Sequence, residues 1–141
     1  MAKKKITIES TGKTAAYAAV GRRKRAVAKV RFYIGAGENT INGKPAVQAC
    51  QTVLQKKKTM LPLTLAGLTD QYHYSAKVVG GGVNGQIDAV MHAVARSIGK
   101  MSEALNTTMS QNGLLTRDPR EKERKKYYRV RARKMPQFAK R

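Results

Sequence analysis

The sequence predicts a small α+β domain followed by a basic tail. Residues 26–34 and 72–79 alternate between apolar and other side chains, a pattern typical of half-buried strands. Over 87–101 the apolar residues recur with a period of 3.6, which is typical of a helix packed on a core. Residues 117–141 hold twelve basic and three acidic residues and too few apolar ones to form a core of their own.

The positive charge is concentrated at the edges of the chain. The 141 residues include 29 Lys and Arg against 8 Asp and Glu, a formal net charge of +21. Residues 21–31 hold six basic residues and no acidic one, whereas 32–116 hold seven basic and four acidic residues. A compact domain with this excess repels itself, so we expect a polyanionic partner. Nucleic acid is the first candidate and an acidic membrane surface is the second.

Three regions are expected: a basic flexible arm over 1–16, a globular domain over 17–116 and the tail over 117–141. The single cysteine, Cys50, excludes an internal disulfide and a cysteine-based zinc site. The first ten residues lack the apolar run of a secretory signal, and no stretch approaches the roughly 18 apolar residues of a membrane helix. We therefore expect a cytoplasmic location.

Two main strands and one short strand are predicted. In 26–34 the even-numbered residues from Ala26 to Ile34 form the apolar face, while Lys29 and Arg31 lie on the opposite face. A glycine-containing turn over 35–39 leads into a short return strand over 40–42. The second main strand, 72–79, carries Tyr72, Tyr74, Ala76 and Val78 on one face.

Four helices are predicted. Pro45 opens a helix over 46–54, and Lys56, Lys57 and Lys58 follow near its C-terminus, where they suit the helix dipole. After an irregular stretch over 62–67 and the second strand, Asn84 is the expected N-cap of the apolar-striped helix, with Asp88 in its first turn. A short helix is predicted over 102–109, and Asn112 and Gly113 after it are a stop signal.

A fourth helix is predicted at the start of the tail. Asp118, Pro119 and Glu121 match a capping box, which predicts a helix over 119–126 with a Glu121–Lys125 ion pair. Beyond Tyr127 the tail should be extended, because Pro136 bars a helix and few apolar residues are present.

The tail is the strongest functional signal. An extended segment of this kind becomes ordered only against a partner, and arginine offers bidentate contacts to phosphate. Tyr127, Tyr128 and Phe138 are suited to stacking on bases. We expect RNA contacts from Arg117, Arg120, Arg124, Lys125, Lys126, Arg129, Arg131, Arg133 and Lys134. The alternatives are a solvated charge run and a localisation signal.

A second basic cluster precedes and continues into the first main strand. It consists of Arg22, Arg23, Lys24, Arg25, Lys29 and Arg31, which we expect to neutralise RNA phosphates. A nuclear-import signal and a charged sheet edge that deters aggregation are the alternatives.

The loop Gly80-x-Gly82-x-x-Gly85 matches a dinucleotide-binding fingerprint and offers the best case for an enzyme. No strand is predicted after the following helix to complete the unit, and no nucleophile or base cluster accompanies the loop. We expect the glycines to permit close approach of another backbone, which could be RNA, with Gly81 and Gly82 at a phosphate. His73 and His92 are isolated, so no metal, cofactor, catalysis or small-molecule substrate is expected.

Four segments together resemble the universal S-nine family of small-subunit ribosomal proteins, with the bacterial type closest. They are GRRKRAVAKVRF at 21–32, VVGGGVNGQIDAV at 78–90, TRDPREKERKK at 116–126 and ARKMPQFAKR at 132–141. The resemblance covers residues 17–141. It departs at Tyr128, where family members often have glycine, and at Ala139, where they often have serine.

The resemblance implies a four-stranded sheet with helices on one side and a left-handed crossover. It also implies binding to small-subunit ribosomal RNA in the head of the subunit, beside neighbouring ribosomal proteins. The tail would reach the peptidyl-site transfer RNA through Lys140 and Arg141. A nucleotide-binding enzyme and a free nucleic-acid-binding regulator are the alternatives. A cationic membrane binder is disfavoured, because the tail lacks an amphipathic stripe.

Overall fold

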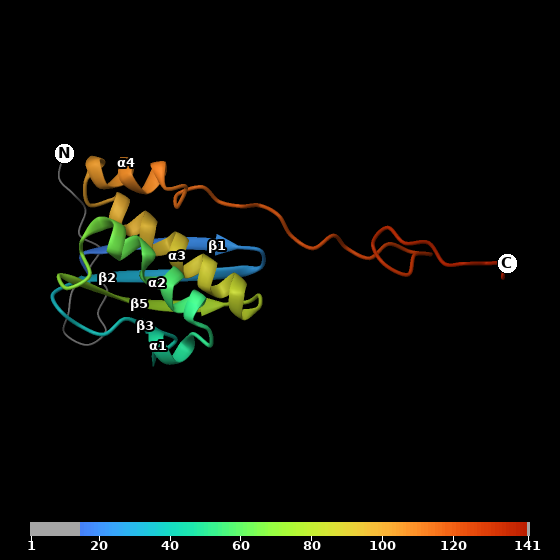
Figure 1. Ribbon diagram of the computed structural model, residues 1–141, viewed down its shortest axis with the longest axis horizontal. Helices are drawn as coiled ribbons and strands as arrows, with labels where there is room; N and C mark the ends of the chain where they lie inside the picture. Colours follow the sequence, from blue (N-terminus) through green and yellow to red (C-terminus); the bar gives the residue numbers. More distant parts are fainter. Residues whose placement is uncertain (1–14, 141) are drawn as a thin grey trace.

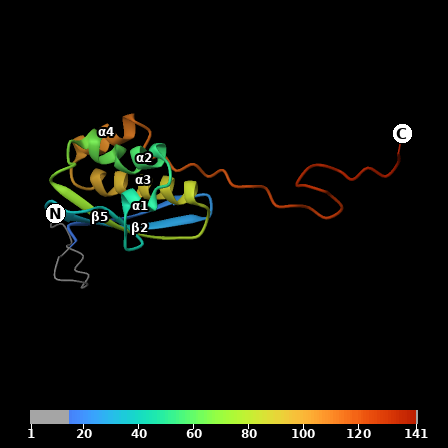
Figure 2. The same ribbon diagram turned by 60° about the horizontal axis from the view of Figure 1, so that its bottom comes forward.

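The computed structural model describes residues 15–140, so the predicted arm over 1–16 lies almost entirely outside the described residues. The elements, in chain order, are β1 (Tyr17–Arg23), β2 (Ala26–Ile34), β3 (Thr40–Ile41), β4 (Lys44–Pro45), α1 (Ala46–Ala49), α2 (Val53–Ala66), β5 (Tyr72–Val79), α3 (Val83–Gly99) and α4 (Glu103–Gln111). The predicted α+β class is confirmed: the helices cover one side of a mixed sheet (Figures 1 and 2). Within the described residues the sheet has five strands, in the order β1-β2-β5-β3-β4, where the resemblance implied four.

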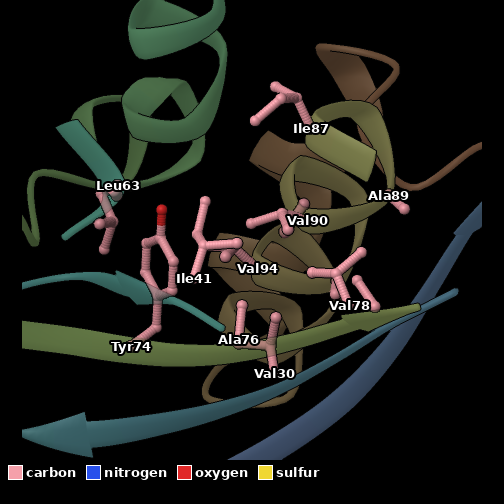
Figure 3. Packing of buried hydrophobic residues seen from close by; sticks show 14 of the residues in the cluster. Val30, Ile41, Leu63, Tyr74, Ala76, Val78, Ile87, Ala89, Val90 and Val94 are labelled. Carbon is pink, nitrogen blue, oxygen red and sulfur yellow. The ribbon is translucent and has the colours of Figure 1, made fainter. Parts of the chain in front are cut away.

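The two predicted main strands pair at the centre of the sheet. β2 and β5 are antiparallel, with Val30 opposite Ala76 and Phe32 opposite Tyr74. Their predicted apolar faces are buried under the helices, as Figure 3 shows for Val30, Tyr74 and Ala76. Ile34 departs from the prediction: it is 70 % exposed, because the chain leaves the sheet at that point for the 35–39 turn.

The edge strand β1 was not predicted. It pairs antiparallel with β2 across a turn formed by Lys24 and Arg25. Its inward positions are Ala19 and Gly21, and residues of this size are weak strand formers. They are small because α3 packs directly on the strand: a Cβ atom added to Gly21 would lie 2.1 Å from the carbonyl oxygen of Ala89.

Side chains of α3 and of its C-cap residue also cover the outer edge of β1. The residues that do so are four apart and therefore share one helix face. Lys100 donates to Ala18 O at 2.7 Å, Arg96 donates to Val20 O, and His92 Nδ1 accepts from Arg22 N at 3.4 Å. These bonds occupy backbone groups that would otherwise be available to a strand from another chain.

The short strand β3 was expected to return along β2, and this was wrong. It pairs parallel with β5 and antiparallel with β4. Two asparagine side chains extend its two-residue pairing: Asn39 Oδ1 accepts from Tyr74 N at 3.0 Å, and Asn42 Oδ1 accepts from Val78 N at 2.7 Å. Parallel pairing requires a crossover, which here runs through α1 and α2. Its left-handedness stays a prediction.

The predicted helix over 46–54 is divided in two. Thr52 and Gln55 form a capping box that starts a new helix at Val53, since Thr52 Oγ1 accepts from Gln55 N at 3.3 Å and Gln55 Oε1 accepts from Thr52 N at 3.2 Å. The three lysines 56–58 therefore lie inside α2 and not at a helix C-terminus. The stretch expected to be irregular is also helical, and α2 runs through Pro62 to a left-handed Gly67.

The predicted apolar stripe of α3 forms the centre of the core. Ile87, Val90 and Val94 point towards the sheet and α2 (Figure 3). The helix is buried on more than one side because it lies between the sheet and the pair α2 and α4 (Figure 2). Its N-cap is Gly82 and not Asn84, whose Oδ1 accepts from Gln55 Nε2 at 2.7 Å instead. Asp88 consequently lies in the second turn.

The helix predicted at the start of the tail is absent: the described residues 116–126 contain no helix. Asp118 Oδ1 accepts from Arg120 N at 2.9 Å, the bond that an N-cap makes, but no helix follows it. Residues 119–126 are all exposed, and a short helix without a buried face is marginal. The predicted helix over 102–109 is confirmed as α4, which begins at Glu103 after Ser102 and ends near a left-handed Gly113.

Candidate nucleic-acid interface

The tip of the β1–β2 hairpin places Lys24 and Arg25 in solvent. Both are exposed, and Lys24 adopts a left-handed φ of 50° to close the turn. Arg22 is exposed as well, one pair further along the strand. Three of the four consecutive cations at 22–25 thus form one exposed cluster, which we call the hairpin cluster: Arg22, Lys24 and Arg25.

The glycine loop lies directly beneath this tip. A Cβ atom on Gly80 would lie 2.7 Å from Arg25 O, and one on Gly81 would lie 3.0 Å from atoms of Ala26. At Gly80 and Gly81, therefore, the glycines permit close approach of the chain's own backbone at residues 25 and 26. Gly82 is different, because open space surrounds it and it caps an α3 N-terminus that has no acidic residue in its first turn. The loop thus places a helix N-terminus beside the hairpin cluster, and both favour an anion.

Arg23 has a different role from its neighbours. Its guanidinium lies 2.9 Å from a carboxylate oxygen of Asp118 and 3.8 Å from one of Asp88. Hydrogen bonds from Arg120, together with the charge of Arg23, hold the pKa of Asp118 well below its usual range. Asp118 is therefore ionised at neutral pH and ties the start of the tail to β1.

His92 provides a second tie between the tail and the domain. Its Nδ1 accepts from Arg22 N, so the ring proton lies on Nε2, which donates to Leu115 O at 3.2 Å. Burial lowers the pKa of His92, which keeps the imidazole neutral at pH 7 and preserves this arrangement. His92, which looked isolated in the sequence, thus connects β1 at Arg22 to the start of the tail at Leu115.

Beyond Asp118 the tail leaves the domain and extends away from it (Figure 1). It contains one loop: Glu123 pairs with Arg133 at 2.9 Å and with Lys126 at 3.1 Å, and Val130 N donates to Lys134 O at 2.9 Å. In the described tail the expected Glu121–Lys125 ion pair does not form. Glu123 is the acidic residue that pairs with the cations of this loop. The expected continuous extension after Tyr127 is therefore interrupted.

The expected stacking residues of the tail are all exposed. Tyr127 is 85 %, Tyr128 94 % and Phe138 88 % exposed. Tyr128 has a left-handed φ of 56°, so the chain bends at the position where glycine was expected from the resemblance. The predicted cations Arg117, Arg120, Arg124, Lys125, Arg129, Arg131 and Lys134 lie along the same segment, and Lys140 lies near its end. Arg141 lies outside the described residues.

A third cationic surface is the sheet face opposite the helices. Lys29 and Arg31 lie there, as the alternation of β2 predicted. Lys77 of β5 joins them, because it is the direct partner of Lys29 in the antiparallel register. Lys77 was missed as a candidate, although the alternation of 72–79 already placed it opposite the apolar face.

The structure lacks the setting in which the glycine loop would bind a dinucleotide. β5, which precedes the loop, is antiparallel to β2, and α3 is followed by α4 and not by a parallel strand. In residues 15–140 no three His, Cys, Asp or Glu side chains gather at metal-binding distance. None of the helices in the same range is both long and apolar enough to cross a membrane.

Comparison with known proteins agrees with the family expected from the four segments. The family described as ribosomal protein S9/S16 matches residues 21–141. The small ribosomal subunit protein uS9 of Dehalococcoides mccartyi strain BAV1 is 43 % identical over 122 residues, which are 86 % of this chain and 92 % of that protein. The corresponding protein of Gloeothece citriformis is 44 % identical over 130 residues, 90 % of this chain and 93 % of its own.

A third relative is equally similar. The protein uS9c of Pyropia yezoensis is 44 % identical over 128 residues, covering 90 % of this chain and 93 % of the relative. The match therefore extends over the domain and the tail alike. The chain belongs to the ribosomal protein S9/S16 family and is a structural protein of the ribosome, not an enzyme.

Proposed function

We propose that this chain binds small-subunit ribosomal RNA in the head of the small subunit of cytoplasmic ribosomes, beside neighbouring ribosomal proteins, and that its tail reaches the peptidyl-site transfer RNA. The domain would act as a folded anchor, and the tail would order in a channel of RNA. Phosphate contacts would position the protein, and the shape of the RNA would provide specificity.

The observation that carries the proposal is the arrangement of the cations. They occupy three surfaces: the hairpin cluster, the open sheet face and the tail. In the described tail only Asp118, Glu121 and Glu123 are acidic, and two of these are already engaged by arginine. A surface with this excess is stable in a compact particle only when a polyanion neutralises it.

The geometry supports individual roles for these residues. We assign ribosomal RNA phosphates to Arg22, Lys24, Arg25, Lys29 and Arg31, and to Gly82 at the α3 N-terminus; Gly81, also expected at a phosphate, packs against Ala26 instead. Arg23 lies in the same run but is held by Asp118 and Asp88, so we assign it to positioning the tail. In the tail the RNA contacts are assigned to Arg117, Arg120, Arg124, Lys125, Lys126, Arg129, Arg131, Arg133 and Lys134.

The test of RNA binding is its dependence on salt. Each neutralised phosphate on single-stranded RNA contributes about −0.7 to the slope of log affinity against log salt. With roughly ten contacts we expect a slope near −7 for the purified chain on small-subunit ribosomal RNA, measured by filter binding between 50 and 200 mM salt. A slope near zero would refute the proposal.

The transfer-RNA contact is tested at the last two residues. Deleting Lys140 and Arg141 should leave subunit assembly intact and weaken peptidyl-site binding by at most a few kcal/mol, since charged hydrogen bonds contribute about 1.5–3 kcal/mol each. The measurement is transfer-RNA affinity of subunits reconstituted with the truncated chain. Arg141→Lys, with Lys140 left unchanged, is the control, because it keeps both charges. Normal binding by truncated subunits would exclude the contact.

A further inference from the structure

The sheet face opposite the helices holds like charges in direct opposition. Lys29 and Lys77 are register partners on β2 and β5, and both are exposed. The strands β1, β2 and β5 contain no acidic residue that could separate them. Like charges directly opposite each other destabilise a sheet, so this pair costs the isolated domain stability.

A hollow lies over this pair. It has a volume of about 620 Å³ and is lined by Lys29, Arg31, Ser75, Lys77 and the turn at Asn42 and Gly43. The turn forms a fixed wall, because Asn42 bonds both the N–H and the carbonyl of Val78. This volume is in the range of sites that hold a small ligand or one unit of a polymer.

An aromatic pair continues the same face. Tyr33 and His73 are register partners two residues beyond Arg31 and Ser75, about 7 Å along the strands. Their ring centroids are 5.3 Å apart with an interplanar angle of 18°. The His73 ring is fixed, since Nδ1 bonds Gly35 O at 2.8 Å and the backbone of Gly37 lies so close that a Cβ there would be 2.7 Å from the ring.

We propose that this open sheet face is a separate site for a single-stranded RNA segment. Phosphates lie over Lys29 and Lys77, and one base stacks on the Tyr33–His73 platform. The inference rests on the proposed function and extends it from phosphate neutralisation by the hairpin cluster, the sheet face and the tail to a base contact on the domain. RNA is favoured over an acidic protein segment, because the cations suit the phosphates of a nucleotide strand and the stacked rings suit its bases.

The cation is tested with a charge reversal and a matched control. Lys77→Glu in the full-length chain is compared with Lys57→Glu, the same change at an exposed position of α2 on the helix side. We expect Lys77→Glu to weaken binding to small-subunit ribosomal RNA about tenfold or more and Lys57→Glu to weaken it less than threefold. Lys77→Glu should also raise the melting temperature, because the new carboxylate faces Lys29. Weaker binding by a more stable protein cannot arise from unfolding.

The base contact is tested at Tyr33. Tyr33→Phe should bind a short single-stranded oligoribonucleotide as the original chain does, and Tyr33→Leu should bind it about fivefold to tenfold more weakly, because the stacking surface is lost. If the two variants bind equally, no base stacks on Tyr33 and the platform part of the proposal is wrong. If Lys77→Glu and Lys57→Glu have equal effects, the face is not an RNA site. Failure of the unaltered chain to bind ribosomal RNA would instead refute the proposed function itself.

Discussion

A chain that ends at Asp118 is expected to fold as the full-length protein does and to bind small-subunit ribosomal RNA at least about a hundredfold more weakly. The deleted segment holds eleven of the 29 basic residues and two of the 8 acidic ones. Eight of the fourteen cations assigned to ribosomal RNA lie in it, so about six of the roughly ten contacts are lost and the salt slope should become shallower by about 4. Filter binding across a salt series measures both quantities.

The fold should survive because, among the described residues, the deleted segment bonds to the rest of the chain only at Asp118, through Arg120. The last tie to the domain is Asp118, which reaches Arg23, and the loop beyond it is closed by Glu123 with Arg133 and Lys126. A tail of shuffled sequence is the control, since it keeps the charge and should keep the slope while losing selectivity for ribosomal RNA over other RNA. A lower melting temperature of the truncated chain would show that the tail is part of the fold. An unchanged slope would show that the tail does not bind.

The parts of the fold that the sequence predicts well are those with a long, regular pattern. β2, β5 and α3 each repeat their period several times, so burial of one face determines the element and its orientation. The helix α4 was also predicted, because Ser102 and Gly113 mark its ends. In each case the local preference and the tertiary packing agree, which is the condition under which local rules succeed.

The failures occur where a partner far along the chain decides the outcome. β1 is a strand because its small residues allow α3 to approach, and this contact joins residues 21 and 89, which no local pattern reveals. The capping box at Asp118 predicted a helix, yet its carboxylate is engaged by Arg23 from the other end of the domain. β3 was given the wrong neighbour because its pairing depends on Asn39 and Asn42, whose side chains bond β5.

The sequence predicted which charged residues belong to the candidate interface better than it predicted how they are arranged. The run of four cations at 22–25 looked uniform, but strand alternation turns Arg23 towards Asp88 and Arg22 to the other face, while Lys24 and Arg25 lie in the exposed turn. Lys77 became part of the interface only through its register with Lys29. Charge counts therefore identify the class of partner, whereas pairing between strands identifies which cations share a surface.

The largest effect on folding is expected from Gly21→Ala. The added methyl group would lie 2.1 Å from Ala89 O and 2.5 Å from Ala93 N, and both are backbone atoms that cannot rotate away. β1 or α3 must then shift, so we expect a loss of about 3 kcal/mol or more in the free energy of unfolding, since overpacking typically costs 1–3 kcal/mol and occasionally more. Thermal melting should show a decrease of about 10 °C.

The matched control is Gly82→Ser, at a glycine with open space around it and a negative φ of −98°. Serine is at least as good an N-cap as glycine, so this change should alter stability by less than about 0.5 kcal/mol. Equal effects of the two substitutions would mean that α3 does not rest on β1. If Gly21→Ala alone is destabilising, the same contact also sets the position of the hairpin cluster, because Arg22, Lys24 and Arg25 follow Gly21 directly. Displacing β1 should then weaken ribosomal RNA binding in the fraction that remains folded, which links the smallest residue of the strand to the cations at its end.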